Sequence, residues 1–266
     1  MSKVWFVTGS SRGLGRNFVE AALSRGDRVA ATARKSLTEL VDTYGDAVLP
    51  LELDVTDKAA VFEAVEQAHS HFGRLDVIVN NAGYGLSGAI EEISEQQLRD
   101  QLETNLFGPV WVVQAALPFL RAQGSGHIIQ ISSVAGLTGF LLGGGYCASK
   151  WALEGLSEAL AQEVAGFGIK VTVAEPGGYA TEGLTGGVSA DPNPLYDEQR
   201  AALAAYVSSV DFDDPAGAGR AILELADAPN PPLHVFLGQG YELVRQAYAD
   251  RLKTWADWQD FSVSAT

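Results

Sequence analysis

Short apolar segments alternate along the whole chain with longer amphipathic ones, and this alternation restricts the fold more than any other feature. A regular succession of strands and helices predicts a parallel sheet with helices on both faces. Right-handed crossovers then favour a doubly wound α/β sheet. Seven short segments rich in β-branched residues have the character of buried strands: Val4–Thr8, Arg28–Ala33, Val48–Leu53, Leu75–Asn80, His127–Ser132, Lys170–Ala174 and Leu233–Leu237.

Individual residues also predict where several helices begin. Ser36-x-x-Glu39 and Ser94-x-x-Gln97 have the spacing of capping boxes, in which the two side chains satisfy backbone N–H groups reciprocally. Asp214 stands before a proline, a pair that suits the first positions of another helix. These three patterns therefore predict helix starts near residues 36, 94 and 214.

The chain of 266 residues has the length of one large domain or two small ones. No repeat or low-complexity linker divides it, so we expect a single domain over 1–266. Pro50 lies in the third strand, and the order 3-2-1-4-5-6 places that strand at an edge, where proline is tolerated. Glycine and proline concentrate in residues 177–200. We expect a mobile lid at about 183–200, with a plain surface loop as the alternative.

Charge and composition exclude several kinds of partner. The chain has 18 Lys and Arg against 33 Asp and Glu, a net charge of −15, whereas nucleic acids and anionic membranes need a basic face. No apolar run is long enough for a signal-peptide core or a membrane helix. The single cysteine, Cys147, rules out an intrachain disulfide, and the four histidines do not cluster, so no metal site is expected. These features predict a cytoplasmic protein.

A glycine-rich turn follows the first predicted strand and opens the first predicted helix. Its sequence is Thr8-Gly9-Ser10-Ser11-Arg12-Gly13-Leu14-Gly15. Glycine lets the backbone turn tightly and approach a pyrophosphate that is held at a helix N-terminus. The spacing G-x-x-x-G-x-G differs from the commoner G-x-G-x-x-G, and an ordinary tight turn between strand and helix is the alternative.

Tyr146 and Lys150 are four residues apart at the start of a helix predicted over 146–166, so they share one face of it. Free tyrosine has a pKa near ~10, and a nearby ammonium lowers that pKa, which suits a tyrosine to acid–base catalysis. Ser133 ends the fifth strand and offers a hydroxyl to a substrate oxygen. For the neighbouring Ser132, a helix cap or turn is the preferred interpretation.

Asn105 and Pro109 mark a kink in a helix predicted over 94–121. Because proline has no N–H, the main-chain carbonyl of Asn105 loses its intrahelical partner. A freed carbonyl beside a polar side chain predicts a water site. The alternative is a kink that packing alone stabilises.

Together these motifs resemble the short-chain dehydrogenase/reductases, in their compact single-domain branch. The resemblance extends from residue 3 to about residue 181 and implies a Rossmann-type sheet of seven strands flanked by helices on both faces. Motif residues also follow several predicted strands at their carboxyl ends, where parallel sheets bind ligands. The matching segments are TGSSRGLG, Asp54-Val55, Asn80-Asn81-Ala82-Gly83, Asn105, Ser133, Tyr146-x-x-x-Lys150 and Pro176-Gly177-x-x-x-Thr181.

The resemblance also implies a role for each motif residue. Tyr146 is the general acid or base, Lys150 lowers its pKa and holds the nicotinamide ribose, and Ser133 binds the reacting oxygen. Asn105 anchors a water that relays protons past Lys150. Asp54 caps the adenine, Asn81 and Gly83 shape the floor of the cofactor site, and Thr181 contacts the nicotinamide amide. The further cofactor-binding residues are Gly9, Ser11, Arg12, Gly13, Leu14, Gly15, Val55, Ala82, Pro176, Gly178 and Tyr179, with Tyr146 and Lys150 themselves.

Cofactor choice depends on the end of the second strand. NAD-preferring relatives carry an acid there that binds the ribose 2′-hydroxyl, whereas this chain has Ala33-Arg34-Lys35. Arg34, together with Arg12 of the glycine turn, predicts a clamp on a 2′-phosphate through charge-assisted hydrogen bonds. Solvated surface arginines are the alternative. We therefore expect NADP as the cofactor, with NAD less favoured.

The substrate is expected to be a small carbonyl or secondary alcohol with an apolar body. Residues between the catalytic serine and tyrosine supply an apolar wall, and the resemblance suggests hydroxysteroid- or retinol-like compounds. One alternative is a 3-oxoacyl-thioester reductase, although the chain has few cations with which to dock an acidic carrier protein. Another is a non-catalytic NADP-sensing protein on the same fold. The predicted wall residues are Leu137, Phe140, Leu141, Leu142, Tyr179 and Leu184.

The resemblance implies a homodimer or homotetramer built on the two long central helices. A C-terminal amphipathic stretch carries Val244, Tyr248, Leu252, Trp255 and Trp258. An apolar stripe of this kind predicts a segment that docks on the body of the protein or on a neighbouring subunit, and not on a ligand.

Overall fold

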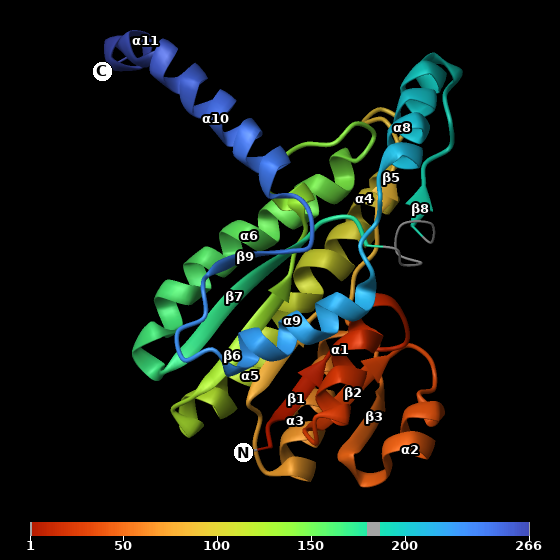
Figure 1. Ribbon diagram of the computed structural model, residues 1–266, viewed down its shortest axis with the longest axis vertical. Helices are drawn as coiled ribbons and strands as arrows, with labels where there is room; N and C mark the ends of the chain where they lie inside the picture. Colours follow the sequence, from red (N-terminus) through yellow and green to blue (C-terminus); the bar gives the residue numbers. More distant parts are fainter. Residues whose placement is uncertain (1, 180–186, 266) are drawn as a thin grey trace.

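A single sheet of seven parallel strands forms the centre of the computed structural model, which describes residues 2–179 and 187–265 (Figure 1). The spatial order is β3-β2-β1-β4-β6-β7-β9, the doubly wound arrangement that the sequence predicts, and Pro50 lies in the edge strand β3. All seven predicted strands are present. They are β1 (Val4–Val7), β2 (Arg28–Ala33), β3 (Val48–Glu52), β4 (Val77–Asn80), β6 (Gly126–Ile131), β7 (Ile169–Pro176) and β9 (His234–Leu237).

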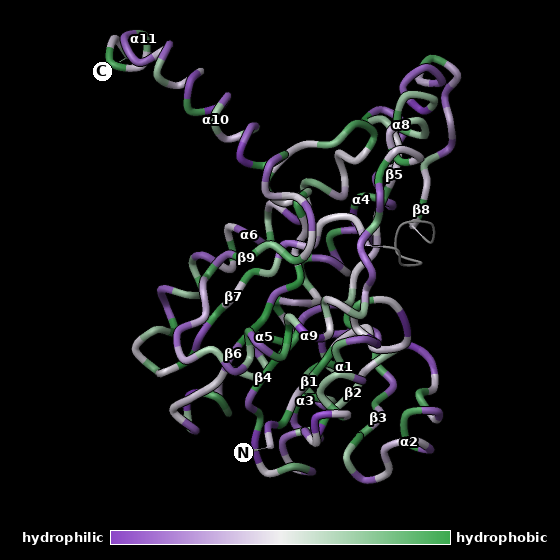
Figure 2. Tube along the Cα trace, in the orientation of Figure 1, coloured by the Kyte–Doolittle hydropathy of each residue, from purple (hydrophilic) through white to green (hydrophobic). Residues whose placement is uncertain are grey.

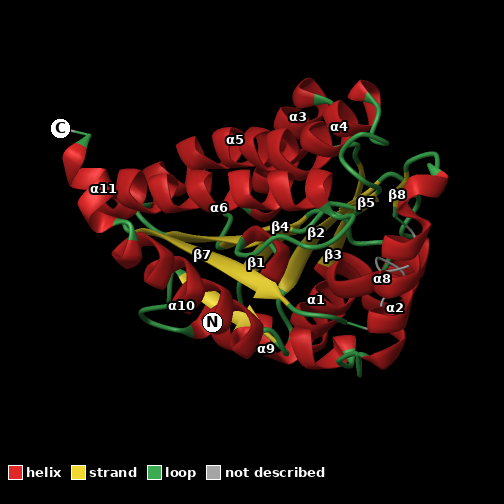
Figure 3. Ribbon diagram, turned by 90° about the horizontal axis from the view of Figure 1, so that it is seen from above, coloured by secondary structure: helices red, strands yellow, loops and turns green. Residues whose placement is uncertain are grey.

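Helices cover both faces of this sheet (Figure 3). One face carries α3 (Lys58–Phe72), α5 (Gly108–Gln123) and α6 (Gly144–Val164), and the other carries α1 (Gly13–Ser24), α2 (Thr38–Tyr44) and α9 (Pro215–Asp227). The remaining elements are η1 (Gly45–Ala47), β5 (Leu86–Ser87), α4 (Glu95–Leu102), η2 (Glu103–Phe107), η3 (Val134–Gly136), η4 (Ala165–Phe167), β8 (Val188–Ser189), η5 (Pro194–Tyr196), α8 (Asp197–Ser209), α10 (Tyr241–Asp257) and α11 (Gln259–Ser264).

Two hydrophobic cores stabilise the sheet, one on each face, and Figure 2 shows the central strands as largely apolar. Successive residues of a strand point to opposite faces, so Phe6 joins the core beneath α3 and α5 while Trp5 joins the core beneath α1. Both side chains are fully buried. Burial of a side chain of this size contributes about 1.5–3 kcal/mol. The alternation along β1 therefore ties both helix layers to one strand.

Two of the three predicted helix starts are confirmed. Ser94 and Gln97 form a capping box at α4, and the Asp214 carboxylate accepts the N–H of Ala216 at the start of α9. The capping box predicted at Ser36 is wrong, because α2 begins at Thr38 without a side-chain cap. The residue before it, Leu37, is buried in the core, so packing fixes where this helix starts.

The last two helices, α10 and α11, project from the body as an arm (Figure 1). Val244 near its base is the buried residue of the described part of this arm, and Arg251 stacks 4.9 Å from the ring of Trp151 on α6. Farther out, Leu252, Trp255, Trp258 and Phe261 are 58–66% exposed. The prediction that this stretch docks on the body is therefore wrong beyond its base. Docking on a neighbouring subunit stays a prediction.

Within the described residues, every helix is too short or too polar to cross a lipid bilayer. This holds for the protruding arm as well, because Figure 2 shows polar and apolar residues alternating along α10. Such a pattern is typical of a helix that buries one stripe against protein and leaves the other in water.

Asp27 ties the amino-terminal end of the sheet to the chain that precedes it. Its buried carboxylate accepts the indole N–H of Trp5 at 2.8 Å and the backbone N–H of Lys3 at 2.9 Å. Arg25 also donates to it. Three donors on one buried carboxylate make Asp27 the main polar anchor between β1 and β2.

We expect Asp27→Ala to lower the free energy of unfolding by about 3 kcal/mol, because it leaves the buried indole N–H of Trp5 without an acceptor. Urea-induced unfolding followed by tryptophan fluorescence measures this difference. The matched control is Asp42→Ala on the exposed side of α2, which should change the free energy by less than about 0.5 kcal/mol. Equal losses in the two variants would contradict the anchoring role of Asp27.

Candidate functional site

A cleft of about 2320 Å³ crosses the carboxyl ends of the parallel strands. Strand order reverses at β1, whose neighbours are β2 and β4, and ligands of doubly wound sheets bind at such a reversal. The cleft collects predicted residues from six different strand ends. Those that line it are Gly9, Ser11, Arg12, Gly13, Leu14, Arg34, Asp54, Val55, Asn81, Ala82, Gly83, Ser133, Tyr146, Lys150, Pro176, Gly178 and Tyr179.

Two predicted site residues within the described part of the chain do not line the cleft. Gly15 and Asn105 are buried behind its wall, where they shape the residues that do line it. Thr181 lies outside the described residues, as do Leu184 and the first part of the predicted lid, 183–186.

The glycine turn is held in place by Asn81. The side-chain amide of Asn81 donates to the carbonyls of Thr8 at 2.9 Å and Gly9 at 3.1 Å, and Gly9 has a φ of +70°. A Cβ added at Gly15 would lie 2.3 Å from the Asn81 amide nitrogen and from the Gly9 carbonyl oxygen. Only glycine fits such a close approach. The turn is thus a compact, fixed cradle.

The cradle ends at the N-terminus of α1. Gly13 and Leu14, the first residues of this helix, line the cleft, and within the described chain no side chain caps the helix start at Arg12. The first N–H groups of a helix carry partial positive charge. This end of the cleft is therefore suited to a phosphate group.

Tyr146 and Lys150 lie one turn apart on α6, as predicted, and both face the cleft. The Lys150 ammonium donates to the carbonyl of Ile131 at 2.8 Å and lies 5.8 Å from the centre of the Tyr146 ring. Burial lowers the pKa of Lys150 to about 8, while Glu154 acts in the opposite direction. Burial raises the pKa of Tyr146, and hydrogen bonding to Ser133 opposes that rise. Ionisation of Tyr146 therefore depends on a cation that offsets its burial.

Ser133 lies where β6 leaves the sheet. Its hydroxyl accepts the N–H of Ala135 at 3.1 Å, so Ser133 is the N-cap of η3. The capping role predicted for Ser132 is therefore wrong, since its neighbour performs it. The hydroxyl of Ser132 is buried and has no hydrogen-bond partner among the described residues. Ser133 is left beside Tyr146 with a hydroxyl at the cleft wall.

The predicted kink at Asn105 is a turn of π-helix, η2, between α4 and α5. The Asn105 side chain accepts the N–H of Tyr84 at 3.1 Å and donates to the Tyr84 carbonyl at 2.9 Å. It also donates to the hydroxyl of Ser149 at 3.1 Å. The side chain is thus engaged with the chain that follows β4 and with α6, and it fixes the distance between them.

The cationic end of the cleft agrees with the sequence prediction. Arg12 and Arg34 are exposed on its rim, and Ala33, which ends β2, places no acid there. Asp54 lies at the end of β3, where its carboxylate accepts the N–H and the hydroxyl of Thr56 at 3.0 and 2.8 Å. This turn fixes the acid at the edge of the cleft.

The opposite end of the cleft is apolar. Of the predicted wall, Phe140, Leu141, Leu142 and Tyr179 line it, whereas Leu137 does not. From residue 187 on, the predicted lid contains β8, which pairs in parallel with β5, then η5 and the first residues of α8, a helix that continues beyond the predicted end at 200 to Ser209. Strand β8 and helix α8 add apolar residues that the sequence analysis missed, although Leu203, Tyr206 and Val207 recur at helical spacing, which was a usable signal. They are Val188, Leu203, Tyr206 and Val207, with Leu86 from β5 and Val210.

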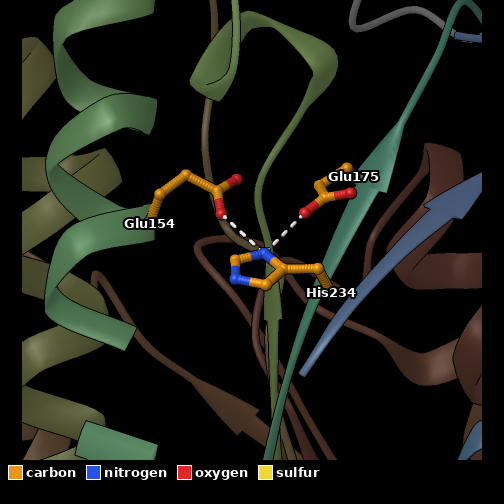
Figure 4. A group of neighbouring side chains, drawn as sticks. All are labelled: Glu154, Glu175 and His234. Carbon is orange, nitrogen blue, oxygen red and sulfur yellow. Dashed lines mark hydrogen bonds and ion pairs between the residues drawn. The ribbon is translucent and has the colours of Figure 1, made fainter. Parts of the chain in front are cut away.

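The structure also brings together three polar side chains that the sequence analysis did not single out. His234 on β9 lies between Glu154 on α6 and Glu175 on β7 (Figure 4). Its Nδ1 is 2.9 Å from Glu175 Oε1 and 3.5 Å from Glu154 Oε2. The three residues are far apart in the sequence and become adjacent through the packing of α6 and the pairing of β7 with β9. No spacing pattern in the sequence therefore predicts this cluster.

Comparisons with known proteins identify the family of the chain. The family model described as short chain dehydrogenase matches residues 3–190. Oxidoreductase BOA17 of Botryotinia fuckeliana (strain B05.10) is 44% identical over 247 residues, which are 90% of this chain and 89% of that protein.

Solved structures extend the likeness to the whole chain. The crystal structure of a short-chain dehydrogenase from Streptomyces avermitilis has a TM-score of 0.92 and 39% identity, and covers 100% of this chain and 99% of that one. A structure described as ElxO with NADP bound has a TM-score of 0.78 and 29% identity, and covers 91% of this chain and 99% of that one. The chain described above therefore belongs to the short-chain dehydrogenase family and is an oxidoreductase of that type.

Proposed function

We propose that this protein is an NADP-preferring reductase or dehydrogenase that interconverts a carbonyl and a secondary alcohol. The observation that carries the proposal is the convergence of Ser133, Tyr146 and Lys150 on one wall of a cleft whose other end is a glycine cradle. The cradle fits a dinucleotide, because the fixed glycine turn leads into the N-terminus of α1, where Gly13 and Leu14 line the cleft. When bound, the nicotinamide cofactor supplies or accepts the hydride.

The chain's own residues handle the proton. Tyr146 gives its phenolic proton to the carbonyl oxygen during reduction and takes one from the hydroxyl during oxidation. Ser133 donates a hydrogen bond to the same oxygen, and the Lys150 ammonium stabilises the phenolate of Tyr146. We assign water binding to the main chain of Asn105, because its side chain is engaged and Pro109 offers no N–H to its carbonyl.

For the cofactor, we assign Arg34 and Arg12 to the 2′-phosphate, Asp54 to the adenine, and Asn81 with Gly83 to the floor of the site. The ElxO structure, which holds NADP, supports the choice of NADP. The role of Thr181 at the nicotinamide amide rests on the sequence resemblance.

For the substrate, the apolar end of the cleft supports a ketone or alcohol with a hydrophobic body, of hydroxysteroid or retinol type. We propose that the wall from Val188 to Val207 covers this body and excludes water, as the expected lid would. An acyl-thioester on an acidic carrier is disfavoured, because the chain is itself strongly acidic.

We further propose that a second copy of the chain covers the C-terminal arm. Large apolar side chains are exposed along it, and patches of this kind mark interfaces. Residues 241–265 carry four acidic and three basic residues, a formal charge of −1 in a chain of −15. Two arms therefore approach each other with little of the repulsion that keeps the acidic bodies apart.

Tyr146→Phe is expected to lower kcat by about 10²–10⁴-fold, because it removes the acid–base group and leaves the ring that packs in the wall. Steady-state turnover of a ketone panel with NADPH measures the loss, and calorimetry checks that NADPH binding stays within about threefold. Tyr248→Phe on the arm is the control and should keep wild-type turnover. A Tyr146→Phe enzyme within threefold of the wild-type rate would contradict the assignment.

Arg34→Ala is expected to reduce the preference for NADP over NAD by about 10–150-fold, the value of one charge-assisted contact of ~1.5–3 kcal/mol. Ala33→Asp combined with Arg34→Ala should invert the preference, because the new acid repels the 2′-phosphate and binds the 2′-hydroxyl. The measurement is kcat/KM for each cofactor with one fixed substrate. Arg99→Ala on the exposed face of α4 is the control, and an unchanged ratio in Arg34→Ala would refute the role of this residue.

Leu252→Asp combined with Trp255→Asp is expected to reduce the molar mass measured by light scattering from that of a dimer or tetramer to a smaller species. The two added charges lie on the apolar stripe and oppose its burial. Gln246→Asp combined with Thr254→Asp adds the same charge to the opposite side of α10 and should leave the mass unchanged. A monomeric wild-type protein, or an assembly that tolerates the first pair, would show that the arm has another partner.

A further inference from the structure

Glu154 continues the helical stripe that carries the two catalytic residues. It lies one turn beyond Lys150 on α6, as Lys150 lies one turn beyond Tyr146, so the three side chains share one face of the helix. Glu154 is only 5% exposed, and neither of its carboxylate oxygens accepts a hydrogen bond from a described residue. A buried carboxylate without donors is costly, so its presence beside a catalytic lysine calls for a functional explanation.

The carboxylate also packs beneath the segment that carries Ser133. A Cβ added at Gly136 would lie 2.8 Å from Glu154 Oε1 and 2.7 Å from the Ser132 hydroxyl oxygen. The absence of a side chain at Gly136 thus gives Glu154 its room. The carboxylate reaches both elements that build the catalytic wall, α6 and the end of β6.

His234 connects this buried carboxylate to water. Its Nδ1 faces Glu175 Oε1 at 2.9 Å and Glu154 Oε2 at 3.5 Å (Figure 4). Its Nε2 lies 3.4 Å from Glu158 Oε1. The His234 side chain is 37% exposed, whereas those of Glu154 and Glu175 are 7% and 1% exposed. The imidazole is therefore the member of this group of three that reaches solvent.

The charged groups around Glu154 come from three elements. Lys150 and Glu158 lie on α6, Glu175 on β7 and His234 on β9. Three carboxylates thus share one ammonium and one imidazole, so carboxylate charge in the interior depends on both cationic groups. The donor atoms of Glu154, Glu175 and His234 lie within 4.8 Å of one another, a spacing that a metal ion accepts. The neighbouring Lys150 ammonium disfavours a second cation there, and a proton on the imidazole satisfies the same carboxylates.

We propose that Glu154 is a positioning residue that keeps Lys150 in its ammonium form, and that His234 in turn keeps Glu154 ionised. This inference rests on the proposed function, because it acts through the pair of Tyr146 and Lys150. An ionised Glu154 favours the state in which the phenolate and the ammonium are present together. When Glu154 is neutral, the pair shifts toward phenol and free amine, which cannot take a proton from an alcohol.

Glu154 and Lys150 have pKa values in the range where such an enzyme works. Burial raises the pKa of Glu154 to about 7, with the charges of His234 and Lys150 acting against the rise, and burial lowers the pKa of Lys150 to about 8. Glu154 is thus ionised above about pH 7, where its charge holds the proton on Lys150. Removing that charge lowers both pKa values of the Tyr146 and Lys150 pair, and it also lowers the fraction that holds the active charge pair.

The test compares pH profiles of kcat/KM for alcohol oxidation with NADP. Glu154→Gln is expected to lower the plateau about tenfold and to move the acid-side midpoint to lower pH. His234→Gln is expected to move that midpoint to higher pH, because Glu154 then keeps its proton longer. The double variant should match Glu154→Gln alone, since His234 acts through Glu154. Glu163→Gln, exposed near the end of α6, is the matched control and should shift neither quantity.

Three outcomes would overturn the proposal: midpoints that do not move, midpoints that move in the same direction in both single variants, or a double variant whose loss is the product of the two. Purely structural damage lowers the plateau without these opposite shifts. A profile that changes when EDTA is added would also overturn it, because a metal ion would then occupy the place of the proton.

A second readout does not depend on turnover. Because the pKa of folded Glu154 is raised above its ordinary value of 4.5 to about 7, its contribution to stability is present at pH 4.5 and is lost as pH rises through 7. Glu154→Gln should therefore lose less unfolding free energy than wild type between pH 5 and 8, and equal losses would overturn the proposal. If Tyr146→Phe kept full activity, the proposed function would fail while this stability difference remained.

Discussion

Parallel pairing of all seven strands is the constraint on which the rest of the structure depends. It sends every strand in the same direction, so the turns that follow six strands meet at one edge of the sheet. The glycine turn after β1 and the Asn81 segment after β4 become neighbours for this reason, and their hydrogen bonds then fix the cradle. Chemistry that is scattered over most of the sequence is thereby concentrated in one cleft.

The second organising element is α6, which crosses the sheet face beside the cleft. The four-residue spacing of Tyr146, Lys150 and Glu154 gives this helix one polar stripe that extends from the cleft into the protein interior. Two residues of the stripe contact strands of the sheet. Lys150 donates to the carbonyl of Ile131 on β6, and Glu154 lies next to His234 on β9. The catalytic wall and the buried acidic cluster are therefore connected through side chains of one helix.

The sequence predicts the sheet, its order and most of the cleft. These features follow from the alternation of strands and helices and from motifs at strand ends, which parallel pairing then brings together. The prediction fails where tertiary packing decides. Leu37, which is buried, fixes the start of α2 in place of a cap at Ser36, and Ser133 takes the capping position assigned to its neighbour. The cluster of Glu154, Glu175 and His234 exists only through contacts among α6, β7 and β9, and no spacing of residues along the chain contains that information.

Gly136 shows what such long-range packing implies for change in this protein. Its backbone conformation is open to any residue, since its φ is not positive, and the need for glycine arises from the Glu154 carboxylate against it. A larger residue at 136 is therefore compatible with the fold only if the side chains of both Ser132 and Glu154 shrink or turn away. An engineer who wishes to remodel this part of the catalytic wall therefore has to redesign positions 132, 136 and 154 together.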